Sequence, residues 1–283
     1  MNIQNKESYA EFKRNCTEHR YYSYDAIHDK IFVPPALLIA WICIRLNVSA
    51  NLISWFSGVV AIISGILFSS EDLKYVLIGA VLFLIWFLLD YVDGSVARYK
   101  KTTSIEGQYI DWLMNVIANV SVTTGIAFGA FIQAGNWIIP FAILSILASV
   151  LSQDRNAFGW YSIVMQRQKN ICEETFEQAI PIEENSISKK NEVYLKIRKY
   201  VTLFFHEQYM IFLLPIFTIM QLTFFHEYID FRVILVVLGG SIYFLAMLLI
   251  INSVVKEKKA TRAYNKLFIS KQKPSLPKDH WFD

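Results

Sequence analysis

Long apolar blocks constrain this chain more than any other feature. Each block approaches or exceeds the roughly 20 residues that a helix needs to cross a bilayer. Hydrophobic residues make up 54% of the 283 positions, above the roughly 45–50% of soluble domains. We therefore expect an all-α polytopic membrane protein. The blocks predict six transmembrane helices, at roughly 52–70, 73–98, 107–133, 136–165, 200–224 and 229–256.

An N-terminal region, residues 1–47, precedes the first of these spans. Residues 1–30 mix aromatic and charged side chains, which suits an amphipathic helix at the headgroup level, and they lack the apolar centre of a signal peptide. The stretch IFVPPALLIAWICIRL, residues 31–46, is apolar but short. We expect it to form an interfacial helix, with a seventh span as the alternative. A transmembrane domain over 48–256 and a basic tail over 257–283 complete the chain.

Positive charge lies on one predicted side of the membrane. The N-terminal region, the 98–106 turn, the 154–199 segment and the C-terminal end from Lys256 onward hold 25 of the 27 Lys and Arg residues. The positive-inside rule then places these segments and both termini in the cytoplasm. The connection at about 166–199 is either a solvated linker or a partial lid over a cytoplasmic site.

The glycines and cysteines bear on how the chain assembles. Gly125 and Gly129 form a GxxxG pair in the third span, and such a pair lets two helices approach closely. We expect it to serve packing within the chain, with a homodimer contact as the alternative. The chain has three cysteines, Cys16, Cys43 and Cys172, which is an odd number. They are expected on the cytoplasmic side of the membrane, which is reducing, so we expect no structural disulfide.

Acidic residues lie inside two predicted spans, where a charge is costly and by default marks function. Asp90 and Asp93 share one helix face, and Asp111 and Asn115 share a face of the next, antiparallel span. A rise of about 1.5 Å per residue places Asp93 opposite Asp111 and Asp90 opposite Asn115. Three carboxylates would repel one another strongly there. A hard divalent cation would remove that repulsion, and oxygen ligands favour magnesium, manganese or calcium.

The surroundings of this acidic cluster suit a phosphate-containing ligand. Gly94 and Gly107 leave space for a close backbone approach, and Arg98 adds positive charge at the rim. Together these features point to a nucleotide diphosphate or another phosphoester. The alternative is an acidic cluster that pairs with Arg98 only for helix packing. A transporter is disfavoured because the acids lie at one side of the bilayer, and we expect no nucleic-acid partner.

Two stretches carry a family resemblance. DYVDGSVAR, followed after eight residues by GQYIDWLMN, resembles the signature D-x2-D-G-x2-A-R-x8-G-x3-D-x3-D of the CDP-alcohol phosphatidyltransferase family. VSANLISW, residues 48–55, is similar to the family's PN-x-x-T segment, with Ala50 in place of proline and Asn51 at the asparagine. The matching signature positions are Asp90, Asp93, Gly94, Ala97, Arg98, Gly107 and Asp111.

The resemblance implies a phosphotransferase with its active site at the cytoplasmic face. Such an enzyme passes a phospho-alcohol group from a CDP-linked donor to a hydroxyl acceptor and releases CMP, using two divalent cations, Mg²⁺ or Mn²⁺. The acceptor would be a small alcohol, a lipid or a lipid-linked glycan, in phospholipid or surface-glycan synthesis. The implied metal ligands are Asp90, Asp93, Asp111 and Asn115, with Asp111 and Asn115 at the catalytic positions. The implied CDP pocket is Gly94, Ala97, Arg98 and Gly107, with Asn51 as a weaker member.

Asn115 departs from the signature, which has aspartate as a metal ligand and proposed base. An amide cannot take a proton at neutral pH, although its oxygen can bind a metal. Three explanations stay open: an engineered substitution, a natural subgroup with another base, and an impaired enzyme that binds metal and donor without turnover. The candidate substitute bases are Glu106, Asp154, His206 and Glu207, and a surface or capping role is the simpler interpretation for each.

Overall fold

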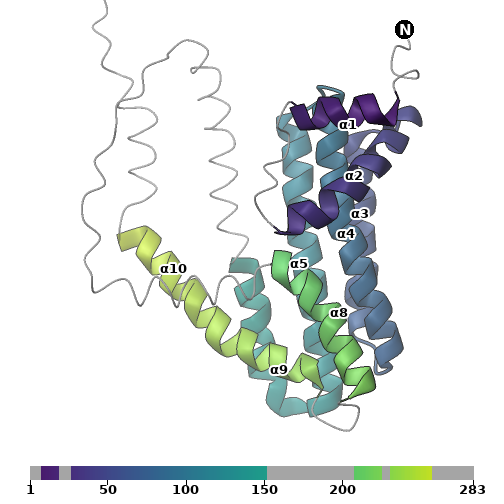
Figure 1. The fold of residues 1–283 in the computed structure, drawn as a ribbon. Helices are drawn as coiled ribbons and strands as arrows, with labels where there is room; N and C mark the ends of the chain where they lie inside the picture. Colours follow the sequence, from purple (N-terminus) through teal and green to yellow (C-terminus); the bar gives the residue numbers. More distant parts are fainter. Residues whose placement is uncertain (1–7, 19–26, 152–206, 225–229, 257–283) are drawn as a thin grey trace, which may run out of the picture.

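The computed structural model describes residues 8–18, 27–151, 207–224 and 230–256, and all regular structure in these ranges is helical (Figure 1). The all-α prediction is therefore confirmed for the described residues. The α-helices are α1 (Tyr9–Glu18), α2 (Ile27–Arg45), α3 (Ala50–Phe68), α4 (Leu73–Tyr99), α5 (Ile105–Ala134), α8 (Glu207–Thr223), α9 (Phe231–Leu238) and α10 (Phe244–Lys256). A 3-10 turn (Asn136–Ile138) follows α5, and a π-helical segment (Gly239–Tyr243) joins α9 to α10.

Four described stretches are long and apolar enough to cross a membrane, namely Ala50–Phe68, Leu73–Tyr99, Glu106–Ala134 and Phe231–Leu249. They correspond to the first, second, third and sixth predicted spans. Two shorter apolar helices, Asn136–Leu151 and Met210–Thr223, occupy described parts of the predicted fourth and fifth spans. The count of six therefore stays a prediction. The 166–199 connection, the 257–283 tail and Cys172 lie outside the described residues.

A polar side chain fixes the start of four of the described helices. In α3, α4, α5 and α9, a side-chain oxygen just before the helix accepts a hydrogen bond from a backbone N–H of the first turn, the usual N-terminal cap. The capping residues are Ser49, Asp72, Ser104 and Asp230, respectively. The Ser104 hydroxyl accepts from the Gly107 N–H at 2.9 Å, so the register of α5 is set immediately before the predicted site.

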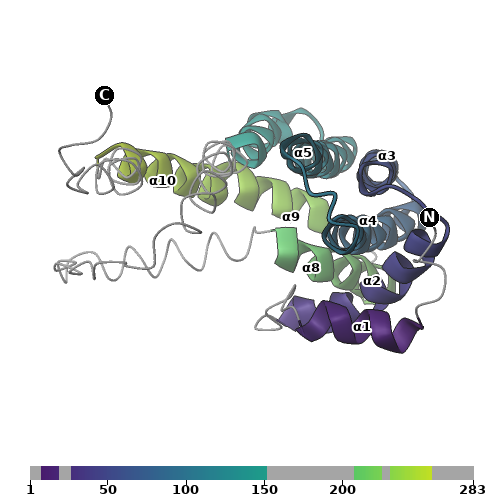
Figure 2. The same ribbon diagram turned by 90° about the horizontal axis from the view of Figure 1, so that it is seen from above.

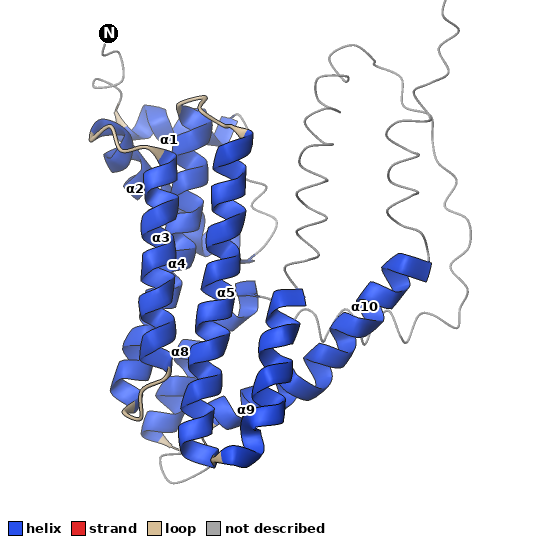
Figure 3. Cartoon of the chain, turned by 180° about the vertical axis from the view of Figure 1, so that it is seen from behind, coloured by secondary structure: helices blue, strands red, loops and turns tan. Residues whose placement is uncertain are grey.

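Helix α3 packs closely against both α4 and α5, whereas α4 and α5 share much less close packing with each other. The three long helices lie side by side in Figure 3. Small residues allow the contact of α3 with α5. Gly58 lies against the Met114 side chain, Gly65 against the Ser121 backbone, and Gly125 against the Gly65 carbonyl. At Gly65 and Gly125 the facing backbone leaves no room for a Cβ atom. Gly125, the first glycine of the GxxxG pair, therefore packs within the chain, as expected.

Helices α1 and α2 cover the side of α4 that faces away from α5 (Figure 2). On α1, Phe12 is fully buried and meets the Tyr99 ring edge-on at 4.9 Å between centroids. On α2, the Asp29 carboxylate accepts a hydrogen bond from the Tyr91 hydroxyl at 2.7 Å. These contacts fix the last turns of α4, which carry the acidic residues.

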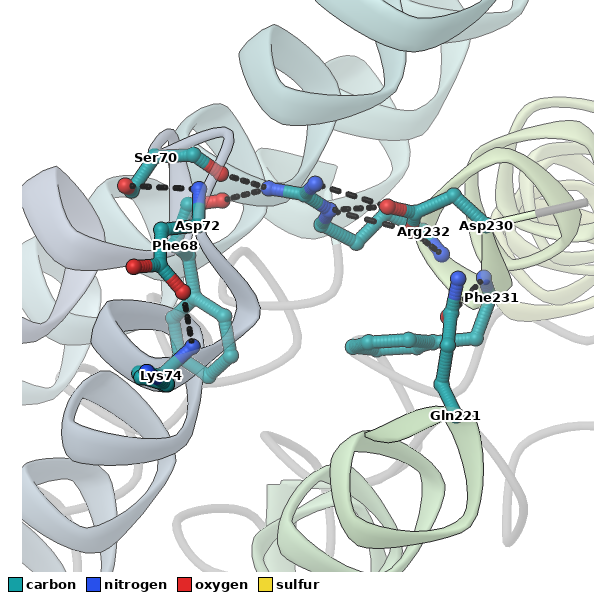
Figure 4. A network of polar contacts seen from close by, with 8 residues as sticks. All are labelled: Phe68, Ser70, Asp72, Lys74, Gln221, Asp230, Phe231 and Arg232. Carbon is teal, nitrogen blue, oxygen red and sulfur yellow. Dashed lines mark hydrogen bonds and ion pairs between the residues drawn. The ribbon is translucent and has the colours of Figure 1, made fainter. Parts of the chain in front are cut away.

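Arg232 holds the opposite end of the bundle together (Figure 4). Its side chain is 0% exposed and pairs with Asp230 at 2.7 Å between Nη2 and Oδ2. Its Nη1 also donates to the carbonyl oxygens of Phe68 at 2.8 Å and Ser70 at 2.7 Å. The last carbonyls of a helix have no partner within it, so Arg232 satisfies the end of α3. Gly129, the second GxxxG glycine, leaves space for the guanidinium.

Asp230→Asn should lower the free energy of unfolding by about 3–5 kcal/mol, because asparagine can still cap α9 but leaves the Arg232 charge buried without its counter-charge. Asp72→Asn is the matched control. Asp72 caps α4 in the same way but is exposed, so its substitution should cost less than about 0.5 kcal/mol. Unfolding of both purified variants in detergent measures the difference, and equal losses would contradict the role of the ion pair.

Candidate active site

The structure brings the predicted acidic residues together across α4 and α5. Asp90 and Asp93 lie in the last turns of α4, and Asp111 and Asn115 lie in the first turns of α5. The Asn115 Nδ2 donates to Asp90 Oδ1 at 3.3 Å and to Asp111 Oδ1 at 3.1 Å. Asp93 lies within electrostatic reach of Asp111. The pairing of Asp90 with Asn115 is therefore the one that the spacing predicts, and Asp111 lies near Asp93.

A third helix also takes part in this cluster. Ser54 of α3 donates its hydroxyl hydrogen to Asp93 Oδ2 at 2.5 Å, and the two residues are 4% and 5% exposed. This bond fixes the orientation of the Asp93 carboxylate. Sequence reasoning missed Ser54 as a site residue. The signal was present, since Ser54 occupies the threonine position of the PN-x-x-T segment.

The predicted pocket residues surround the acidic cluster at the same end of the bundle. The Arg98 guanidinium folds back along α4 over Gly94, where a Cβ atom would lie 3.2 Å from both Nη1 and Nη2. Ala97 lies between them in the sequence and is half-buried. Asn51 of α3 comes beside Gly107, where a Cβ atom would lie 3.3 Å from Asn51 Oδ1. The two glycines thus make room for a basic and an amide side chain.

The candidate substitute bases are only partly described. Glu106 is exposed in the first turn of α5, next to Gly107. Glu207 is the first residue of α8, and its side chain is not described. Asp154 and His206 lie outside the described residues. Of the four candidates, Glu106 is thus the one whose side chain the structure describes, and that side chain is exposed.

The donor set of the cluster suits a divalent cation. Asp90, Asp93, Asp111 and the Asn115 amide offer hard oxygen ligands of the kind that Mg²⁺ and Mn²⁺ prefer. Within the described ranges, however, no three His, Cys, Asp or Glu side chains form a metal-binding group by themselves. The Asn115 amide nitrogen stands between two of the carboxylates. A half-turn of this amide would present Oδ1 there instead, so Asn115 would complete the ligand set.

Part of the chain is similar to a known enzyme family. A sequence model of the ceramide phosphoethanolamine synthase family matches residues 29–137. A curated relative, ceramide phosphoethanolamine synthase from Drosophila melanogaster, is 35% identical over 88 residues, which cover 29% of this chain and 22% of the relative. The match thus spans about a fifth of the relative's length. The family match runs from α2 to the turn after α5 and includes the whole acidic cluster, so this segment is similar to membrane transferases of lipid synthesis.

Ser54→Ala should weaken Mn²⁺ binding about ten- to hundredfold, because a residue that orients a metal ligand typically contributes that much. Ser57→Ala is the matched control. Ser57 is also buried, at 2% exposure, but donates to the Ser54 carbonyl of its own helix at 2.7 Å. Electron paramagnetic resonance of Mn²⁺ measures binding to the purified protein. Unchanged affinity in Ser54→Ala, or the same loss in both variants, would refute the orienting role.

Proposed function

We propose that this protein is an integral membrane phosphotransferase of lipid synthesis that uses a CDP-linked donor. The observation that carries the proposal is the convergence of Asp90, Asp93, Asp111 and Asn115 across α4 and α5. Their spacing resembles the CDP-alcohol signature, and they lie within the segment that is similar to ceramide phosphoethanolamine synthase. Four helices long and apolar enough to cross a membrane support the location.

The proposed reaction exchanges one phosphorus–oxygen bond for another. The acceptor oxygen bonds to the phosphorus that carries the alcohol, the pyrophosphate bond to that phosphorus breaks, and CMP leaves with the bridging oxygen. The acceptor proton passes to a base or to water. Two bound divalent cations, Mg²⁺ or Mn²⁺, would supply neutralisation of the pyrophosphate and of the leaving CMP.

The residues of the cluster have separate roles in this proposal. Asp90, Asp93 and Asp111 hold the cations, and Arg98 attracts the negatively charged donor at the rim. Asn115 can add its amide oxygen to the ligand set but cannot take the acceptor proton. Glu106, exposed beside the site, is the described candidate for that step.

The comparison also favours one substrate arrangement. The relative's name, ceramide phosphoethanolamine synthase, favours a soluble CDP-amino-alcohol as donor and a lipid as the hydroxyl acceptor. The distribution of Lys and Arg puts the acidic end of the bundle at the cytoplasmic face, where such a donor is dissolved. A donor and acceptor screen with mass analysis of the lipid product tests this arrangement.

One observation favours a second candidate function, a membrane protein that binds metal and donor without turnover. The Asn115 amide occupies the position of the family's base and bridges two carboxylates by hydrogen bonds. CMP release distinguishes the two functions. Binding of CDP-amino-alcohols and CDP-diacylglycerol without CMP release, for any acceptor and with either Mg²⁺ or Mn²⁺, would favour the non-catalytic binder.

Asn115→Asp should raise CMP release about 100-fold or more if only the carboxylate base is missing, since a positioned general base typically contributes about 10²–10⁴-fold. Asn119→Asp, one turn further along α5, adds the same charge outside the cluster and should give no gain. The Asn119 amide donates to the Asn115 carbonyl at 2.9 Å, so the two positions are neighbours. No gain in Asn115→Asp would show that another group acts as the base.

Asp93→Asn should reduce divalent-dependent CMP release to background, because it removes a charged metal ligand that is buried between three helices. Asp72→Asn makes the same chemical change at the other end of α4 and should leave the release intact. The measurement is CMP release against Mg²⁺ and Mn²⁺ concentration. Metal dependence that survives in Asp93→Asn would refute the assignment of this cluster.

A further inference from the structure

The face of α5 that carries the acidic cluster also carries two unsatisfied polar atoms. Gln108 Oε1 and Trp112 Nε1 are buried and have no hydrogen-bond partner among the residues that the structure describes. Gln108, Asp111, Trp112 and Asn115 follow the spacing i, i+3, i+4 and i+7, so they share one helix face. A buried acceptor and a buried donor therefore flank the Asp111 carboxylate.

Such atoms are unfavourable unless a partner reaches them. Leaving a buried donor or acceptor unpaired lowers stability, and native proteins keep few such atoms. An apolar side chain of similar shape at either position would avoid that cost. A bound ligand with both a donor and an acceptor would satisfy both atoms together.

A second indole, Trp86, differs from Trp112 in its surroundings. Its Nε1 is also unpaired within the described part of the chain. However, Trp86 is 0% exposed and stacks on Phe83 at 4.9 Å in the core of the bundle. Gln108 and Trp112 are only half-buried, at the end of the bundle where the predicted pocket residues gather. Gln108 and Trp112 therefore each keep part of their surface exposed, which Trp86 does not.

We propose that Gln108 and Trp112 form the subsite for the cytosine base of the donor, an inference that rests on the proposed function. The cytosine amino group would donate to Gln108 Oε1, and a ring acceptor of cytosine would receive the Trp112 N–H. Residues one helical turn apart have Cβ atoms about 5–6 Å apart, a spacing that one pyrimidine edge can bridge.

The test compares a ligand that contains the base with one that lacks it. CMP and inorganic pyrophosphate, each with Mn²⁺, are titrated into the full chain in nanodiscs by calorimetry. Gln108→Met and Trp112→Phe each remove one hydrogen-bonding atom and keep much of the side-chain shape. Each should weaken CMP binding about tenfold and leave pyrophosphate binding unchanged. The matched control, Trp86→Phe, should change neither affinity.

The outcomes separate this inference from the function on which it rests. Wild-type CMP affinity in both variants would overturn the subsite and leave the proposed function intact. An equal loss of CMP and pyrophosphate binding would also overturn it, because the two residues would then support the shape of the site and not the base. A wild-type protein that neither binds CMP nor releases it from any donor would refute the proposed function, and the subsite with it.

Discussion

The close contact between α3 and α5 at Gly65 and Gly125 is the constraint on which the acidic cluster depends. The two backbones meet there with no room for a side chain, and small residues are the means by which helices approach closely in lipid. Because α3 also packs along α4, it sets the distance between the helices that carry the carboxylates. A larger residue at Gly125 would shift both halves of the site without touching either of them.

The spacing of residues along the helices was enough to predict which members of the acidic cluster face each other. It could not predict contacts between residues that are far apart in the sequence. Asp90 and Asn115 could be placed opposite each other because two periodic helices and one short turn fix their relation. Ser54 reaches Asp93 across 39 positions. Helix periodicity does not report such a contact, although the PN-x-x-T resemblance marks Ser54 as a position of interest. The all-α class followed from the apolar blocks alone. The fourth and fifth spans stay predictions, because residues 152–206 lie outside the described part of the chain.

Asn115 shows how one side chain can keep a site intact and change what it can do. Its amide is neutral and bridges Asp90 and Asp111 by hydrogen bonds, so it separates two carboxylates that would otherwise repel. An aspartate there would add a fourth negative charge, so the stability of the cluster would depend more strongly on bound cations. With asparagine at position 115, the site is therefore more stable without metals than it would be with aspartate. This difference applies whether or not turnover is retained.

The Arg232 contacts with Phe68 and Ser70 have a consequence for the order in which the protein matures. Arg232 lies 164 positions after Phe68, and a ribosome adds about 5–20 residues per second. For at least several seconds after α3 is made, its terminal carbonyls must rely on water or on headgroups, because their partner does not yet exist. Helices α3 to α5 can assemble early, but their far end is completed only when α9 is inserted. A nascent chain that stalls before α9 would therefore hold the acidic cluster in an unfinished bundle, a state that quality-control proteases can recognise.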